Sequence, residues 1–180
     1  MANVKNVTTP RGEIRWAIIS GKGKTDLKGR DIYTVDLVLS EEEAAPLIEE
    51  IQDYWEENKP KGAKAPKSTG YKQLADGNYS FTFKTSTSYP SGDPKVIKIY
   101  DAKARPTELG DKRIGNGSIG RIAGAISVYD AGPASRGVTA YLDSIQLLKF
   151  LEYSGGTNAF AADDDYDFDG GNAFDSDELI

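Results

Sequence analysis

Two glycine-containing motifs in this chain have spacings that suit phosphate binding. The segment Gly115–Gly120 fits the pattern G-x-G-x-x-G, but a dinucleotide site needs a strand before this pattern and a helix after it. Residues 119–129 have the pattern of a strand, so the glycines predict a turn that enters a strand. Gly23, Lys24 and Thr25 match the end of a phosphate-binding loop, but Ile18 stands where that loop requires glycine. Neither motif predicts a nucleotide site.

The spacing of the carboxylates and the absence of Cys and His argue against a metal site or a catalytic site. Asp165, Asp167 and Asp169 open like a calcium-binding EF-hand loop, but the twelfth position is Ser176 instead of glutamate and no amphipathic helix flanks the segment. The chain has no Cys and no His, which excludes disulfides, cysteine nucleophiles, histidine bases and Cys/His zinc sites. The remaining carboxylates form no cluster by spacing. We therefore predict no catalytic residue, no metal site and no cofactor, and the chain is not expected to be an enzyme.

Charge is distributed very unevenly along the chain. Residues 163–180 carry eight carboxylates and no Lys or Arg. Subtracting these eight from the chain's 28 acids leaves 20 acids against all 22 bases in residues 1–162, a net charge of +2. A segment of charge −8 cannot pack into a core without burying uncompensated charge, so it acts through what it attracts. The candidates are a metal ion, a basic partner and the chain's own basic surface.

The body itself combines an acidic helix with a basic remainder. Residues 41–57 hold eight acids and no bases, so the rest of residues 1–162 has 12 acids against 22 bases, an excess of +10. Aromatic residues are interleaved with these bases. Single-stranded nucleic acid is bound by this mixture, because Lys and Arg contact phosphates and flat rings stack on unpaired bases at about 1–3 kcal/mol per base.

Hydrophobic periodicity predicts six strands and one helix, which favours a small closed barrel or sandwich. The expected strands cover residues 13–20, 31–39, 79–84, 95–101, 118–129 and 138–151, with alternating apolar residues. Ser40 and Glu43 have the spacing of a capping box. Pro46 predicts a first turn followed by a helix that restarts at Pro46 and covers about 46–58. Residues 59–73 are expected to form a mobile basic loop.

Several aromatic residues have two interpretations, core packing or base stacking. Tyr79, Phe81 and Phe83 share one strand face, and Tyr54 and Trp55 share the apolar stripe of the helix, so these are expected in the core. Regular alternation would put Ile14, Trp16 and Ile18 on one face, which leaves both interpretations open for Trp16. On the last part of the 118–129 strand, small residues beside Tyr129 leave room for a base or sugar. The candidate DNA-binding residues are Trp16, Lys22, Lys24, Lys28, Arg30, Tyr33, Tyr71, Lys95, Lys98, Tyr100, Arg113, Arg121, Tyr129 and Arg136.

The order of these features resembles a known family. A basic body, Gly155 with Gly156, and an acidic tail that ends in apolar residues are similar to the single-stranded DNA-binding proteins of tailed bacteriophages, of the type found in short-tailed coliphages. The strand 31–37 followed by an acidic helix, the strands 79–84 and 95–101, and the Gly115–Ser118 turn entering a strand that ends at Tyr129 have that family's order and spacing. The likeness covers most of the body.

The resemblance implies an OB-fold in residues 1–153, a Greek-key barrel with one inserted helix, followed by a linker and disordered acidic tail in residues 154–180. It also implies sequence-independent binding of single-stranded DNA in phage replication or recombination, and a chain that can form a homodimer. Its tail would compete with DNA and recruit replication or recombination proteins. The partner-binding residues would be Asp175, Asp177, Glu178, Leu179 and Ile180. The tail ends in Ile180 and not in the family's terminal Phe, so the identity of the partner stays open.

Three other functions stay open on the sequence alone. The chain could be a protein–protein adaptor whose acidic tail mimics DNA, a phage structural protein, or a nuclease that uses carboxylates with Mg²⁺. Residues 1–15 contain no apolar signal-peptide core, and no apolar run is long enough to span a membrane. We therefore expect a cytoplasmic protein of the host cell that does not associate with membranes.

Overall fold

The computed structural model describes residues 3–153, which form ten strands and one helix. The elements are, in chain order, β1 (Lys5–Thr8), β2 (Gly12–Ile18), β3 (Lys24–Thr25), β4 (Asp31–Leu39), α1 (Glu41–Asn58), β5 (Tyr71–Gln73), β6 (Tyr79–Ser86), β7 (Lys98–Tyr100), β8 (Pro106–Thr107), β9 (Ser118–Asp130) and β10 (Arg136–Lys149). The predicted linker at Gly155 and Gly156 and the predicted acidic tail lie outside the described residues. No helix of the described residues is long and apolar enough to cross a membrane.

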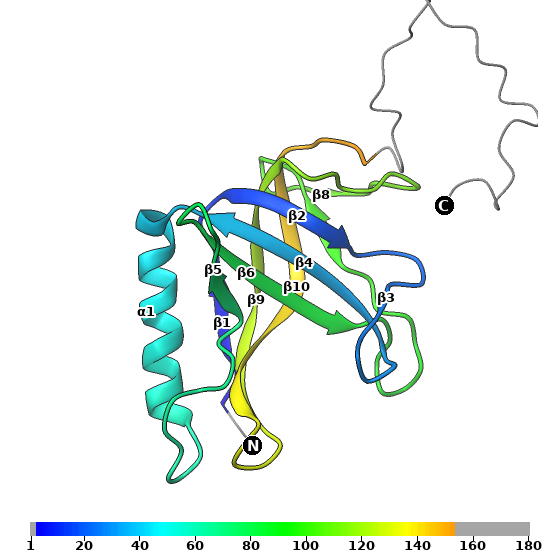
Figure 1. Ribbon diagram of the computed structural model, residues 1–180. Helices are drawn as coiled ribbons and strands as arrows, with labels where there is room; N and C mark the ends of the chain where they lie inside the picture. Colours follow the sequence, from blue (N-terminus) through cyan, green and yellow to red (C-terminus); the bar gives the residue numbers. More distant parts are fainter. Residues whose placement is uncertain (1–2, 154–180) are drawn as a thin grey trace, which may run out of the picture.

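Five of the strands close into a barrel (Figure 1). β9 pairs with β2, β2 with β4, and β4 with β6, all antiparallel. β10 pairs in parallel with β6 and antiparallel with β9, which completes the circle. This order, with one parallel pair, is the Greek-key connectivity of an OB-fold. The predicted fold class is therefore confirmed, and α1 is inserted between the second and third barrel strands.

The inward faces of the barrel strands form one core, as the alternation predicts. Val35, Leu37 and Leu39 on β4 are buried against Phe81 and Phe83 on β6. β9 alternates buried and partly exposed residues along most of its length, with Ile122 and Ile126 in the core. These side chains leave water on folding, at about 25 cal/mol per Å² of apolar surface, which is the main favourable contribution to the stability of the barrel.

The helix begins earlier than the sequence predicts. α1 runs without a break from Glu41, so the prediction of a restart at Pro46 is wrong. Ser40 is the N-cap: its hydroxyl accepts a hydrogen bond from the Glu43 backbone N–H at 3.1 Å, which is one of the two bonds of the predicted capping box, and donates to the Glu43 carboxylate at 3.0 Å. A proline inside a helix removes one hydrogen bond and costs about 3 kcal/mol. Burial of the α1 side chains Ala44, Leu47, Ile51, Tyr54 and Trp55 outweighs this cost, at about 1.5–3 kcal/mol for each large apolar residue.

A bulge in β2 changes the face on which Trp16 lies. The register passes from Arg15 opposite Asp36 to Ile18 opposite Thr34, so β2 contains one extra residue. Trp16 adopts a left-handed backbone angle, φ 53°, and its N–H donates to the Asn116 side-chain oxygen at 2.8 Å. Ile14 is fully buried whereas Trp16 is 66% exposed, so the two do not share a face. Regular alternation fails here because a bulge shifts every later residue by one position.

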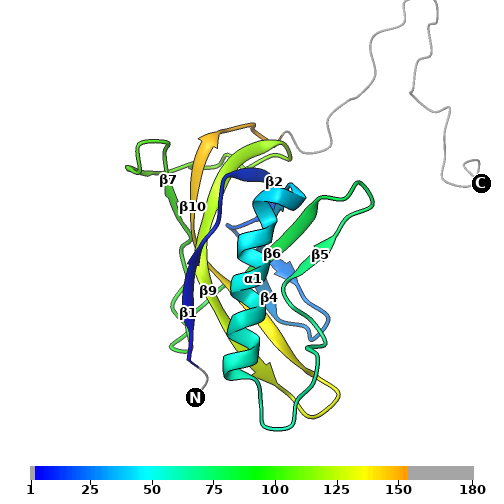
Figure 2. The same cartoon turned by 90° about the vertical axis from the view of Figure 1, so that its left-hand side faces the viewer.

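The predicted mobile loop of residues 59–73 is tied to the barrel in its second half. Lys67 N–H donates to the Arg136 carbonyl at 2.7 Å, and Val138 N–H donates to the Ser68 carbonyl at 2.9 Å. Residues 71–73 then form β5 on the edge of β6. Figure 2 shows this segment running beside α1 toward β6. β1, β3, β5 and β8 were not predicted, because two to four residues give too few alternations to detect.

The tightest backbone contact of the barrel lies between β9 and β10 at Gly124. A Cβ atom added at Gly124 would overlap the Tyr141 carbonyl oxygen and would also meet the Phe83 ring at 3.2 Å. Neither neighbour can yield easily, because the carbonyl belongs to the strand pair and the ring belongs to the core. Only glycine fits at this position.

We expect Gly124→Ala to lower the free energy of unfolding by roughly 1–3 kcal/mol, because the added methyl group must push β9 and β10 apart. Urea denaturation followed by circular dichroism measures the change. Ala123→Ser, on the adjacent and partly exposed position of the same strand, should alter it by less than about 0.5 kcal/mol. Equal stability of the glycine and alanine proteins would contradict the contact.

Candidate nucleic-acid interface

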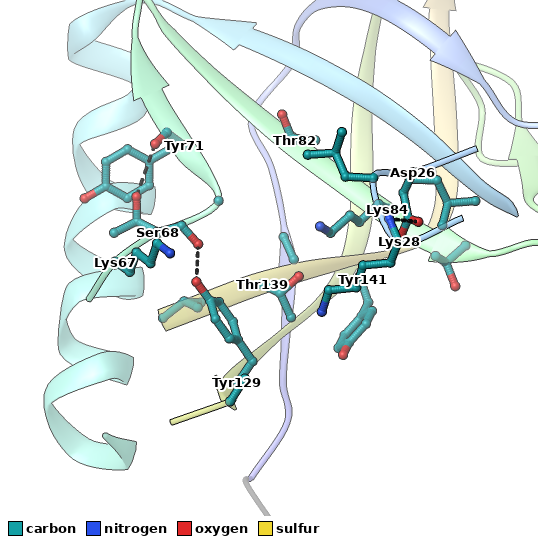
Figure 3. A pocket seen from close by; sticks show the side chains of 18 of the residues that line it. Asp26, Lys28, Lys67, Ser68, Tyr71, Thr82, Lys84, Tyr129, Thr139 and Tyr141 are labelled. Carbon is teal, nitrogen blue, oxygen red and sulfur yellow. Dashed lines mark hydrogen bonds between the residues drawn. The ribbon is translucent and has the colours of Figure 1, made fainter. Parts of the chain in front are cut away.

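A hollow of about 980 Å³ lies on the outer surface of the barrel, across β6 and β10. We call it the groove. Its walls are the loop of residues 26–30 between β3 and β4, the segment of residues 67–72 before and in β5, and the end of β9 at Tyr129 and Asp130 with the following turn residue Ala131. Figure 3 shows side chains from these segments around one opening. The groove is therefore built by parts of the chain that are far apart in sequence.

The floor of the groove consists of outward-facing side chains from two strands. On β6 these are Thr82 and Lys84, which alternate with the buried Phe81 and Phe83. On β10 they are Thr139 and Tyr141, which alternate with buried Val138, Ala140 and Leu142. Lys84 and Tyr141 are register partners across the parallel pair. The floor is polar, with hydroxyl, ammonium and phenol groups pointing outward.

One wall is fixed by hydrogen bonds around Asp26. Its carboxylate accepts from the backbone N–H groups of Lys28 and Arg30, each at 2.9 Å, and from the Arg30 side chain at 3.0 Å. The backbone bond from Arg30 is the main reason why the pKa of Asp26 is lowered, with the Arg30 side chain adding to it. The neighbouring loop between β2 and β3 is held from the core, because the Tyr33 hydroxyl donates to the Gly21 carbonyl at 2.9 Å.

The opposite wall is held by Tyr129 and the segment before β5. The Tyr129 and Ser68 hydroxyls are hydrogen-bonded at 2.7 Å, as the dashed line in Figure 3 marks. Tyr71 lies farther along the same wall, where its ring packs against Tyr79 and Phe81 and its hydroxyl accepts a bond from Gln52 at 3.3 Å. Both rings are partly exposed at the groove.

The groove has a surplus of positive charge. Its lining contains five bases, Lys28, Arg30, Lys67, Lys72 and Lys84, and two acids, Asp26 and Asp130. Both acids are paired with arginine: Asp26 with Arg30, and Asp130 with Arg136 at 2.8 Å. The bond from the Arg136 side chain is the largest cause of the lowered pKa of Asp130. Four lysine ammonium groups in the lining therefore form no ion pair with a described residue.

Four of the fourteen predicted DNA-binding residues line the groove: Lys28, Arg30, Tyr71 and Tyr129. The structure corrects the prediction for Tyr33: this residue is only 6% exposed and belongs to the core, so its ring is not available to a base, and its hydroxyl supports the loop between β2 and β3. The others lie outside the groove: Trp16, Lys22, Lys24, Lys95, Lys98, Tyr100, Arg113, Arg121 and Arg136. The tail residues Asp175, Asp177, Glu178, Leu179 and Ile180 lie outside the described part of the chain.

The sequence prediction missed several groove residues. Lys67, Lys72 and Lys84 line the groove but are not among the predicted residues, because no local pattern in a sequence indicates which lysines converge in the fold. Tyr141 could have been predicted from the sequence. It alternates along β10 with the apolar residues Val138, Ala140 and Leu142, so its side chain must point away from the core. Within residues 3–153 no group of three or more His, Cys, Asp or Glu side chains could hold a metal ion.

No protein-family model and no curated protein sequence matches this chain. Several solved structures, however, are similar to this chain in fold. The crystal structure of gp2.5, a single-stranded DNA-binding protein encoded by bacteriophage T7, aligns with a TM-score of 0.61 and 21% identity, over 89% of this chain and 100% of that one. The single-stranded DNA-binding protein of bacteriophage Enc34, in complex with single-stranded DNA, aligns with a TM-score of 0.60 and 12% identity, over 83% of this chain and 89% of that one. This chain therefore has the fold of these phage proteins.

Proposed function

We propose that this chain binds single-stranded DNA, without sequence preference, in the groove across β6 and β10. The observation that carries this proposal is the surplus of lysine ammonium groups in an open groove whose two carboxylates are already paired with arginine. A polyanion releases its counterions when it binds such a surface, which favours association with any phosphate backbone. The groove lies between the loops that flank the oligonucleotide-binding face of OB-folds in general.

Aromatic side chains favour single strands over duplexes. Tyr71, Tyr129 and Tyr141 present partly exposed rings at the groove. An unpaired base can stack on such a ring, whereas a paired base has both faces covered by its neighbours in the duplex. Stacking accepts every base, and the hydroxyl groups of Thr82 and Thr139 do not form the bidentate patterns that read base edges. The fold likeness to the Enc34 protein in complex with single-stranded DNA supports the same conclusion.

The biological role that we propose is in phage DNA replication or recombination, by binding and not by catalysis. The acidic residues 163–180 would act as an internal competitor of DNA, because a tethered segment of charge −8 offers the same kind of charge as the phosphate backbone. Its last residues, Asp175 to Ile180, would be held by a replication or recombination protein. A homodimer and a cytoplasmic location in the host cell belong to the same proposal.

Two groove lysines test the proposed site. We expect Lys67→Gln with Lys84→Gln to weaken binding of an oligothymidine roughly tenfold at low salt and to reduce the slope of log affinity against log salt by about 1.4, since each lost phosphate contact accounts for about 0.7. Fluorescence anisotropy titrations at several salt concentrations measure both quantities.

Lys61→Gln with Lys103→Gln is the matched control, because it removes the same charge from exposed positions outside the groove. This control should keep the wild-type slope. Equal losses in the two double variants would place the binding site elsewhere, and failure of the wild-type protein to prefer an oligothymidine over a duplex would reject the function.

Removal of the tail tests the proposed competition. We expect deletion of residues 163–180 to tighten DNA binding at low salt, because the competitor is gone. The gain should shrink as salt rises, since ions screen the attraction between tail and groove over about 10 Å at 0.1 M. Parallel titrations of the full and shortened chains measure the difference. Unchanged or weaker binding after deletion at low salt would reject competition by the tail.

A further inference from the structure

A second hollow, of about 590 Å³, adjoins the groove. It lies over β1, β9 and β10, and it shares Thr85, Ser86 and Tyr141 with the groove. Tyr141 therefore stands at the boundary of the two spaces. In Figure 3, Tyr141 lies at the opposite end of the groove from Tyr71. A single strand of DNA that followed the groove from Tyr71 past Lys84 would reach the second hollow at Tyr141.

The strand register continues the floor of the groove into this hollow. Lys84 is opposite Tyr141, Tyr141 is opposite Ala125, and Ala125 is opposite Asn6. These four side chains form one row on the outer surface of the barrel. The Tyr141 side chain is 46% exposed, and its backbone is held by the close approach of Gly124 described above. The ring is therefore accessible for stacking, and the β10 backbone that carries it is held in place.

The second hollow has room for a flat group beside the Tyr141 ring. Its floor includes Ala123 and Ala125, and their small methyl side chains leave space above the outer face of β9. A volume of about 590 Å³ falls within the range of about 300–1,000 Å³ for small-molecule sites. The bulge in β10 between Leu142 and Ser144 places the exposed Asp143 at the rim.

Charge distinguishes the second hollow from the groove. Its lining contains one base, Lys95, and one acid, Asp143, so it has no cationic surplus. Lys95 Nζ donates to the Thr85 hydroxyl at 2.8 Å and lies 5.0 Å from the centre of the Tyr89 ring. A site that balances one cation against one carboxylate does not attract a phosphate strongly. It suits the uncharged part of a nucleotide, which is the base.

We propose that a bound single strand continues past Tyr141 and places an unpaired base in the second hollow, stacked on the Tyr141 ring over Ala125, while the phosphates of the strand remain with the lysines of the groove. This inference rests on the proposed function and extends its site. Tyr141 is a contact residue in this arrangement, and Ala123 and Ala125 provide the space.

The test compares Tyr141→Leu and Tyr141→Phe in the full chain, with oligothymidines of about 4 to 16 nucleotides. Loss of the ring should weaken binding of the longer oligonucleotides about fivefold or more, because one stacked base is lost. Tyr141→Phe keeps the ring and should bind like the wild type. Tyr153→Leu is the matched control, since this tyrosine is 53% exposed and lines neither space.

A second variant tests the space without touching the ring. Ala125→Leu fills the floor of the second hollow and should weaken binding of the longer oligonucleotides while leaving the shortest ones unaffected. Photocrosslinking with an oligonucleotide that carries 5-iododeoxyuridine, followed by peptide mapping, should give a crosslink at Tyr141. Thermal melting shows whether each variant is folded.

The outcomes separate this inference from the proposed function. Wild-type binding that depends on Lys67 and Lys84 but is unchanged by Tyr141→Leu and by Ala125→Leu would overturn the second base site and leave the groove in place. Absence of DNA binding by the wild-type chain would overturn both. A Tyr141→Phe variant as weak as Tyr141→Leu would also contradict stacking, because the phenol hydroxyl and not the ring would then be responsible.

Discussion

The pairing of β10 with strands on both of its edges determines where the rest of the structure lies. One edge pairs with β9 over most of its length, and the other pairs with β6 and then with β7. These contacts close the sheet into a barrel, so the apolar faces of its strands share one core. The same closure joins the outer faces of β6 and β10 into one floor and brings the loop before β4 and the turn after β9 to its two sides.

Electrostatic separation follows from this arrangement. None of the eight carboxylates of α1 lines the groove, and the two acids that do are paired with arginine. The chain is acidic as a whole, yet its groove is cationic. Because mobile ions screen charges over about 8–10 Å, a charge in the groove interacts mainly with the groups that line it, among which four lysines form no ion pair with a described residue and both carboxylates do. Net charge alone therefore does not describe the local charge of the groove.

The sequence predicts the main elements well where the signal is periodic. Alternation identifies six of the strands and the inward face of β4, and helical spacing identifies the buried stripe of α1. It fails where a tertiary contact overrides the local rule. Burial of the α1 stripe carries the helix through Pro46, and a bulge held by Asn116 turns Trp16 outward. For the site, the sequence identifies the residue types, but ten of the fourteen candidates lie outside the groove.

The sequence by itself determines the chemistry that is available: an excess of bases with interleaved aromatics in the body, no Cys or His, and a separate acidic segment. Those properties depend only on which residues the chain contains and on their order. Tertiary structure alone decides which cations and rings converge, since Lys28, Lys67, Lys84 and Tyr141 come from four segments that meet only when the barrel closes. It also decides that Tyr33 supports the loop between β2 and β3 from within the core, because one face of each barrel strand must be buried while the other remains exposed to solvent.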